Sequence, residues 1–244
     1  MNSDIVKQQL SFLRMSVAAK ELEQVIGGRQ THFDWVSELL EREIDARKER
    51  ALINRIKRAQ FPKVASLEEF DFDFNPDIDK AKILELATLQ FLHKKQIALF
   101  LGKPGTGKTH LAIAIGIKAV EQGHNVFCSS VKRLAMQIVK AKDRNELDTL
   151  FRKILSAKLW ILDDWGVVSM KSDVSEEVFD LLDRRVHSNS LILTSNRDVD
   201  EWPQVFHEPV IAAAAIDRIF DRAQILTFNG KSYRLNSKIK EIRD

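Results

Sequence analysis

The chain has 244 residues, of which 44% are hydrophobic and 30% are charged, and its formal net charge is +3. That length allows one large domain and a small additional one. No apolar run approaches the roughly 20 residues that cross a bilayer, and the start MNSDIVKQ is too polar for a signal peptide. The single cysteine, Cys128, excludes an internal disulfide and a cysteine-rich metal site. We therefore expect a cytoplasmic protein without membrane contact.

Residues 1–65 are predicted to form a small, all-helical domain. Apolar residues at helical spacing indicate one helix over residues 4–26, and Gly27–Gly28 would end it. The stretch THFD at residues 31–34 resembles a capping box. It would open a second helix that runs to about Ala59.

A change in charge marks the expected start of a second domain, residues 66–244. Between Arg50 and Ser66 there are five basic residues and no acidic ones. Six acidic residues then follow between Glu68 and Asp79. Residues 66–79 also hold three phenylalanines, and we expect them to form an extended connector that packs its aromatic side chains onto the second domain.

Strand and helix patterns alternate from Lys80 onward. Short apolar strands are predicted at residues 96–101, 125–129, 159–162 and 191–194, and helices at residues 80–93, 108–122, 132–142, 146–157, 175–187 and 212–221. This alternation predicts an α/β fold with a parallel sheet flanked by helices. A late pair of strands, 224–228 and 233–235, is predicted around Asn229–Gly230.

The stretch GKPGTGKT at residues 102–109 matches the phosphate-loop pattern GxxxxGK[ST] between a predicted strand and a predicted helix. Its glycines permit backbone angles that let successive N–H groups surround a phosphate. Lys108 would neutralise the β and γ phosphates, Thr109 would hold Mg²⁺, and the helix would direct its positive end to the anion. The sequence thus predicts a nucleoside triphosphate site, with a purely structural glycine-rich turn as the alternative.

Two adjacent carboxylates, Asp163 and Asp164, end the apolar strand at residues 159–162. Neighbouring strand residues face opposite ways, so Asp163 would organise Mg²⁺ through water beside Thr109, and Asp164 would activate the attacking water. The alternative is that both cap the next turn. Asn196 ends another apolar strand, and it would bind the attacking water or the γ-phosphate at the same edge of the sheet. The alternative for Asn196 is a turn-forming role.

These motifs, in this order, resemble those of the AAA+ ATPases. The stretches DRIF (217–220) and NGKSYR (229–234) are similar to the branch that contains the DnaC helicase loader and the IstB transposition helpers. The stretches FP (61–62) and LEEFDF (67–72), after a basic helix, are closer to the IstB family. The resemblance extends over nearly the whole chain.

The resemblance assigns roles to particular residues. It implies that nucleotide contacts come from Gly102, Pro104, Gly105, Thr106, Gly107, Lys108, Thr109, His110 and Arg234, where Arg234 would be the second sensor arginine. It also implies that Asp163 and Asp164 form the Walker B motif and that Asn196 is sensor 1. Asp164 departs from the general pattern, in which most members carry Glu. Its shorter side chain would slow hydrolysis.

Arg218 matches the family's arginine finger, which reaches the ATP of a neighbouring subunit. It follows a long predicted helix, not a strand at the nucleotide edge of the sheet, so reaching its own ATP would require the chain to fold back. ATP would then be shared by two protomers of a homo-oligomer, and assembly would depend on the nucleotide. The alternative is a surface ion pair from Arg218 to Asp217 or Asp221.

Two sets of basic residues are candidate DNA contacts. The helices at 132–157 resemble an insertion that contacts nucleic acid, and their basic residues are Lys132, Arg133, Lys140, Lys142 and Arg144. The other set lies on the helix before residue 60 and comprises Arg47, Lys48, Arg50, Arg55, Lys57 and Arg58. Such side chains bind phosphates without reading the base sequence. A solvated helix face is the alternative for both sets, and a partner protein is a further one for the second.

The resemblance implies an ATP-dependent, DNA-binding regulator of transposition. It would oligomerise on target duplex DNA and recruit or stimulate a separate transposase, with ATP hydrolysis controlling assembly and release. A DnaC-like replicative helicase loader and a metabolite phosphotransferase are the alternatives.

Overall fold

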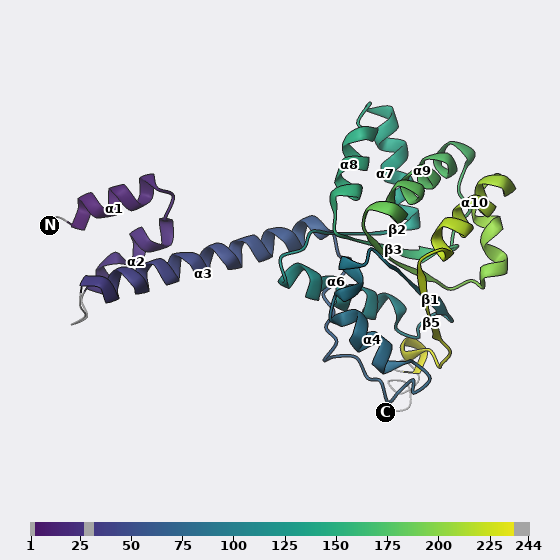
Figure 1. Ribbon diagram of the computed structural model, residues 1–244, viewed down its shortest axis with the longest axis horizontal. Coiled ribbons are helices and arrows are strands. Elements are labelled where there is room, and N and C mark those ends of the chain that lie inside the picture. Colours follow the sequence, from purple (N-terminus) through teal and green to yellow (C-terminus); the bar gives the residue numbers. More distant parts are fainter. Residues whose placement is uncertain (1–2, 27–31, 237–244) are drawn as a thin grey trace. The chain divides into compact units, whose positions relative to one another are not determined.

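The computed structural model describes residues 3–26 and 32–236, and the chain divides into two compact units (Figure 1). The first unit is Met1–Asn54 and the second is Arg55–Asp244. The division lies inside the helix α3 (His32–Ala59), before the boundary expected at residue 65. The domain boundary after residue 65 stays a prediction.

The first unit consists of α1 (Ser3–Phe12), α2 (Ser16–Ile26) and most of α3. The end of α3 at Ala59 is as predicted. The core of the unit is a cluster of buried residues, Ala18, Leu22, Val25 and Leu39, against which Val6, Leu10 and Met15 pack. The expected helix stop at Gly27–Gly28 and the capping residue Thr31 lie outside the described residues.

The single helix expected over residues 4–26 is wrong, because the chain breaks between α1 and α2. Arg14 adopts a left-handed backbone with φ of 59°, and the N–H of Met15 donates to the carbonyl of Leu10 at 2.8 Å. This turn lets Val6 and Leu10 pack against the core cluster of the unit. The apolar spacing continues through the break, so periodicity alone does not reveal it.

The second unit contains a parallel, five-stranded sheet with the order β2-β3-β4-β1-β5. Its strands are β1 (Ile97–Gly102), β2 (Val126–Ser130), β3 (Leu159–Trp165), β4 (Ser190–Ser195) and β5 (Ala223–Phe228). The helices are α4 (Lys80–Ala87), α5 (Gln90–His93), α6 (Lys108–Glu121), α7 (Val131–Asp143), α8 (Leu147–Ser156), α9 (Ser172–Ser188) and α10 (Pro209–Phe220). A 3-10 helix, η1, spans Val199–Val205. The predicted α/β class is confirmed.

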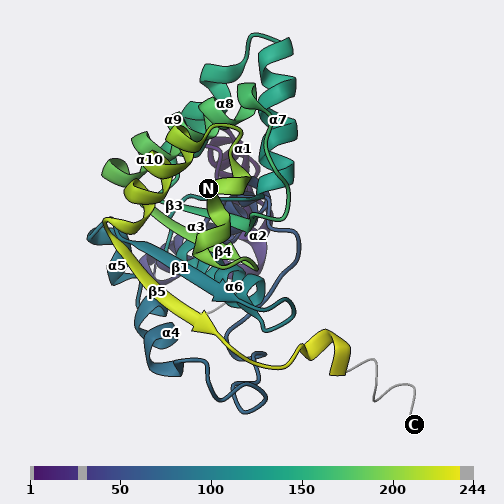
Figure 2. The same ribbon diagram turned by 90° about the vertical axis from the view of Figure 1, so that its right-hand side faces the viewer.

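Helices cover both faces of this sheet. The helices α7, α8, α9 and α10 lie on one face, and α6 and α4 lie on the other (Figures 1 and 2). On the first face, Leu99, Trp160 and Leu193 join one large apolar cluster with residues of those four helices. The central strands are buried on both faces, which explains their continuous apolar sequences. In the described part of the chain, no helix is long and apolar enough to cross a membrane.

Two sequence predictions fail in part in the second unit. The helix expected over residues 80–93 is divided, since Leu89 adopts a left-handed backbone with φ of 64° between α4 and α5. The late strand pair is half right: residues 224–228 do form a strand, β5, but it pairs in parallel with β1, and residues 233–236 form a helical turn in place of the second strand. Ser232 caps that turn: its hydroxyl accepts from the N–H of Leu235 and its carbonyl from that of Asn236.

Candidate functional site

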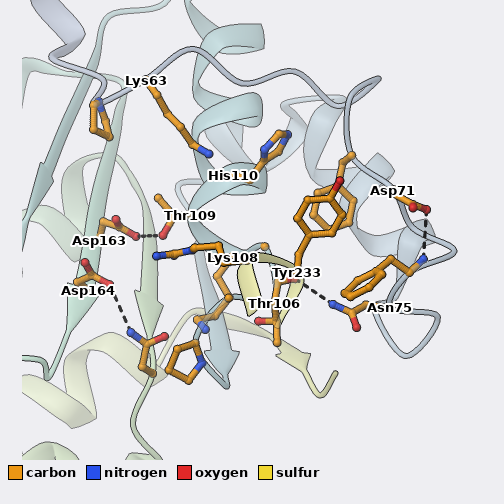
Figure 3. Close-up of a pocket in the computed structure, with 18 of the residues that line it drawn as sticks. Lys63, Asp71, Asn75, Thr106, Lys108, Thr109, His110, Asp163, Asp164 and Tyr233 are labelled. Atoms are coloured by element: carbon orange, nitrogen blue, oxygen red, sulfur yellow. Dashed lines mark hydrogen bonds between the residues drawn. The ribbon is translucent and has the colours of Figure 1, made fainter. Parts of the chain in front are cut away.

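A pocket of about 780 Å³ opens where β1, β3 and β4 end, at the carboxyl edge of the sheet (Figure 3). Ligands of open α/β sheets bind at this edge. The pocket is lined by Pro62, Lys63, Glu69, Phe70, Asp71, Phe74, Asn75, Pro104, Gly105, Thr106, Gly107, Lys108, Thr109, His110, Asp163, Asp164, Val167, Asn196, Tyr233 and Arg234. The fold therefore brings the phosphate loop, both aspartates, Asn196 and Arg234 to one cavity.

The phosphate loop has the backbone that its glycines permit. Gly102, Gly105 and Gly107 have φ values of 143°, 79° and 105°, which side-chain-bearing residues rarely adopt. The loop is also closely covered. A Cβ at Gly107 would lie 2.3 Å from the ring of Phe70, and a Cβ at Gly105 would lie 2.1 Å from the hydroxyl oxygen of Ser232. Both backbone angle and space thus require glycine here.

Lys108 begins α6, and its side chain lies inside the loop. Its Nζ donates to the carbonyl oxygens of Gly102 and Lys103, each at 2.7 Å. Burial lowers the pKa of Lys108 to about 8, although the charges of Asp163 and Asp164 oppose that shift. The amino group is therefore poorly solvated, and a phosphate anion would stabilise its charged form.

Asp163 connects the phosphate loop to the sheet. Its Oδ1 accepts hydrogen bonds from Thr109 Oγ1 at 2.7 Å and from Thr194 Oγ1 at 2.5 Å. Asp163 is 8% exposed and Thr194 is 1% exposed, so the bond between them is shielded from water, whereas the bond to Thr109 is partly buried. The sequence reasoning missed Thr194. Its position at the end of an apolar strand, two residues before Asn196, was the available signal.

Asp164 points away from Asp163, toward Asn196. It has a left-handed backbone with φ of 58°, at a register shift in the pairing of β3 with β4. Its N–H donates to Thr194 Oγ1 at 3.1 Å, and its Oδ1 accepts from Asn196 Nδ2 at 3.4 Å. Burial and, next, the charge of Asp163 raise the pKa of Asp164. A raised pKa suits a carboxylate that takes a proton from water.

Aromatic side chains close the other end of the pocket. Phe70 lies 5.5 Å from His110 and 4.8 Å from Phe72 between ring centres, and Phe74 lies 5.1 Å from Tyr233. Phe70, Phe74 and Tyr233 line the pocket, whereas Phe72 packs on Phe70 behind it. The connector at residues 66–79 does place its aromatic side chains on the second unit, as expected. The sequence reasoning did not identify Phe74 or Tyr233 as lining residues.

The oxygen atoms beside the phosphate loop fit a magnesium ion that arrives with a nucleotide. Mg²⁺ is usually bound by one or two carboxylates together with substrate phosphates. Thr109 and Asp163 supply a hydroxyl and a carboxylate at hydrogen-bonding distance from each other. No group of three or more His, Cys, Asp or Glu side chains that could hold a metal occurs among residues 3–26 and 32–236. The phosphates would therefore have to complete the coordination.

The two arginines named from the resemblance lie in different places. Arg234 lines the pocket. Arg218 lies on α10, does not line the pocket, and forms an ion pair from its Nε to Oδ1 of Asp183 on α9 at 2.6 Å. A surface ion pair thus exists, but its partner is Asp183 and not Asp217 or Asp221.

Several candidate DNA-binding residues are engaged within their own unit. In the first unit, Arg47 pairs with Glu43 at 2.7 Å and Lys48 with Asp45 at 3.3 Å. In the second, Arg133 donates to Gln60, whose side chain also accepts from Gln137. Lys142 pairs with Glu177 at 2.7 Å. In the described chain the candidates with neither an ion pair nor a side-chain hydrogen bond are Arg55, Lys57, Arg58, Lys132, Lys140 and Arg144.

Comparison with known proteins identifies the family. Residues 6–241 match the family described as IstB-like ATP binding protein. The chain belongs to this family. This result confirms the resemblance found in the sequence.

Relatives of the IstB-like chain include proteins of bacterial insertion sequences. It is 38% identical over 219 residues to the putative ATP-binding protein of insertion sequence IS21 from Pseudomonas aeruginosa, covering 90% of this chain and 83% of that one. It is 31% identical over 239 residues to the corresponding protein of IS232 from Bacillus thuringiensis subsp. berliner, covering 96% of each. The family of this chain therefore includes proteins named as putative ATP-binding proteins of insertion sequences.

Solved structures share the AAA+ fold of the IstB-like chain. DnaI superposes with a TM-score of 0.56 at 24% identity, over 68% of this chain and 91% of that one. AMPPCP-bound DnaA from Aquifex aeolicus superposes with a TM-score of 0.59 at 20% identity, over 75% and 56% of the two chains. These likenesses show the fold alone.

Proposed function

We propose that this IstB-like chain is a Mg²⁺-dependent ATPase that regulates transposition. The observation that carries the proposal is the bonding of Asp163 to both Thr109 and Thr194. These contacts hold a carboxylate beside the phosphate loop, where a nucleotide-bound metal needs an oxygen ligand. The kinship with insertion-sequence proteins supports the transposition role.

Five of the pocket residues have a part in the proposed hydrolysis. Lys108 and the N-terminus of α6 bind the β and γ phosphates, and Thr109 and Asp163 hold Mg²⁺, which supplies charge neutralisation when bound. Asp164 takes a proton from the attacking water. Asn196, which is bonded to Asp164, orients that water.

ATP would also connect subunits. Arg218 lies outside the pocket of its own chain, which suits contact with the nucleotide of a neighbouring subunit. The oligomer would bind duplex DNA without sequence preference through Arg47, Lys48, Arg55, Lys57, Arg58, Lys132, Arg133 and Lys140. Residues 1–65 would act as a DNA- or partner-binding domain and residues 66–244 as the ATPase domain. The assembly would recruit or stimulate a separate transposase in the cytoplasm, where its DNA target lies.

The catalytic part is tested by phosphate release from ATP with Mg²⁺ or with EDTA. We expect hydrolysis only with Mg²⁺. Lys108→Ala should lose nucleotide binding, whereas Asp164→Asn should bind ATP and lose hydrolysis by about 10²-fold or more. Normal ATP affinity in Lys108→Ala would contradict the proposed phosphate site.

The biological part is tested with ATP and DNA of different kinds. Duplex DNA should stimulate ATPase activity and produce large ATP-dependent oligomers, measured by analytical ultracentrifugation. If a transposase is encoded beside the gene, strand transfer by that transposase should rise when the protein is added. A preference for single strands together with binding to a replicative helicase would instead favour a helicase loader. A protein that stays monomeric with ATP, Mg²⁺ and duplex DNA would refute the assembly role.

A further inference from the structure

Asn75 connects two segments that are far apart in the sequence to each other and to the phosphate loop. Its side chain is buried, with 3% exposed, in the connector that follows α3. Its Nδ2 donates to the carbonyl of Thr106 at 3.4 Å (Figure 3). The same Nδ2 donates to the carbonyl of Lys231 at 3.2 Å, and Oδ1 accepts from the N–H of Lys231 at 3.0 Å. One amide therefore satisfies three backbone groups.

The bond to Thr106 orients a peptide group of the phosphate loop. In a planar trans peptide, the carbonyl of one residue and the N–H of the next point in opposite directions. Asn75 binds the carbonyl of Thr106, so the N–H of Gly107 is directed away from Asn75. The preceding peptide is held in the same way, since the N–H of Tyr233 donates to the carbonyl of Gly105 at 2.9 Å. Successive N–H groups held in this manner can surround a phosphate.

The segment around Lys231 is shaped for this contact. A Cβ at Gly230 would lie 2.2 Å from Oδ1 of Asn75. The backbone of Gly230 is not in the left-handed region, so the requirement for glycine there is one of space. The close approach shows that Asn75 and this segment are fitted to each other.

The same segment carries Arg234 into the pocket. Arg234 lines the cavity. At Lys108, burial is the main cause of the lowered pKa, and the charge of Arg234 lowers it further. At Asp164, burial is the main cause of the raised pKa, and the charge of Arg234 opposes that rise. Arg234 therefore lies within electrostatic reach of both groups. The two bonds from Asn75 to Lys231 fix the backbone three residues before it.

We propose that Asn75 is a positioning residue that directs the N–H of Gly107 to the phosphate site and holds Arg234 beside Lys108. The inference rests on the proposed binding of ATP at this pocket. Asn75 lines the pocket, but its side-chain amide is bonded to the backbone of Thr106 and Lys231. It acts through the loop and through the segment at residues 230–234.

The test is a double-mutant cycle on ATP affinity in the full chain, measured by calorimetry. Asn75→Asp keeps the size of the side chain but replaces the donor with an oxygen that faces two carbonyls, so we expect ATP to bind about tenfold or more weakly. Arg234→Ala should weaken binding in the wild type and have little further effect with Asn75→Asp. Asn125→Asp makes the same chemical change at an exposed position and is the matched control, which should bind ATP as the wild type does.

Four outcomes would overturn the inference in different ways. Wild-type affinity in Asn75→Asp would refute the positioning role while ATP binding stands, and so would an Arg234→Ala effect of equal size in both backgrounds. A wild-type chain that binds no ATP would refute the proposed function itself. If Asn75→Asp does not fold, Gly230→Ala displaces the same contact from the other side, and it should reproduce the loss; normal ATP affinity in Gly230→Ala would then refute the role.

Discussion

The hydroxyl of Thr194 donates to Asp163 at 2.5 Å and accepts from the backbone N–H of Asp164 at 3.1 Å. This single buried side chain on β4 therefore contacts both acidic residues at the end of β3. It holds the Asp163 carboxylate toward Thr109 and keeps the Asp164 peptide fixed at the register shift. The geometry of both carboxylates depends on it.

Thr194→Val keeps the shape of the side chain and removes its hydrogen bonds. Because the buried carboxylate of Asp163 and the partly buried N–H of Asp164 each lose a partner, the free energy of unfolding should fall by about 1–3 kcal/mol. We expect the hydrolysis rate to fall by about tenfold or more and the Mg²⁺ requirement to rise, with ATP affinity changed less. Steady-state kinetics over a Mg²⁺ titration and urea unfolding measure these effects. Thr227→Val, on the exposed side of β5, is the control; an unchanged Mg²⁺ requirement in Thr194→Val would contradict the expectation.

The depressed pKa of Lys108 predicts a pH dependence of nucleotide binding. Burial lowers this pKa to about 8 in the free protein, and a bound phosphate should raise it again. Below pH 8 the amine is charged with or without nucleotide, so affinity stays constant. Above pH 8 binding must take up a proton, and affinity should fall by up to about tenfold per pH unit.

Calorimetry in two buffers of different ionisation enthalpy measures that proton uptake directly. We expect almost none at pH 7 and close to one proton per site at pH 9. An affinity that stays flat between these pH values would show that Lys108 does not change its protonation on binding.

Arg218 and Asp183 offer a pair of variants that separates a structural from a functional role. Their ion pair is more than a third exposed on both sides, and such pairs contribute little to stability, about 0–1 kcal/mol. If Arg218 served only this pair, Arg218→Ala and Asp183→Asn would behave alike. We expect Asp183→Asn to retain ATPase activity and Arg218→Ala to lose oligomer-dependent hydrolysis by about 10³-fold while still binding ATP.

A mixing experiment tests whether Arg218 acts between subunits. Arg218→Ala subunits keep an intact Asp164, and Asp164→Asn subunits keep an intact Arg218. Mixed at equal amounts, the two inactive proteins should recover part of the ATPase activity, because some interfaces combine both intact residues. No recovery would refute the action in trans.

Glu43 predicts an acid-sensitive first unit. Its buried carboxylate accepts from the N–H groups of Val17 and Ala18 at 2.8 and 3.2 Å and from Arg47 at 2.7 Å. Burial raises its pKa, but these bonds outweigh that effect and the pKa is lowered below 4.5. The resulting stability is present above pH 4.5 and is lost as the pH falls through the lowered pKa of the folded state.

Glu43→Gln removes that charge and should destabilise the first unit by about 2 kcal/mol at neutral pH. Hydrogen exchange of residues 16–47 in the full chain measures the effect. Glu41→Gln makes the same chemical change at an exposed position of α3 and should leave exchange unchanged. Equal exchange in both variants would contradict the role of Glu43.

Local signals predicted much of the second unit. The strands around β1, β3 and β4 are continuous apolar runs that end in polar residues, and the phosphate loop has a pattern that depends on adjacent residues only. These features are sufficient to place the pocket at one edge of the sheet. The hydrogen-bond partners of the site residues could not be predicted from local patterns, because they are distant in the sequence. Thr194 contacts Asp163 across 31 residues, and Asn75 contacts Lys231 across 156.

The wrong predictions also have local causes. At Arg14 and Leu89 the chain takes a left-handed turn without a glycine, and nothing in the residue pattern marks it. The segment after Asn229–Gly230 carries a turn signal, but Ser232 caps a helical turn there and the backbone of Tyr233 bonds to the phosphate loop. Tertiary contacts therefore favour the helical turn over the predicted strand in this segment.

The left-handed backbone of Asp164 has a consequence for evolution in the laboratory. A residue with a Cβ is held there at a cost, and its carboxylate carries an unfavourable charge beside Asp163. Asparagine at this position would remove the charge, and glycine would remove both the charge and the backbone strain. A laboratory selection for thermal stability alone would therefore replace Asp164 and yield more stable proteins that no longer hydrolyse ATP.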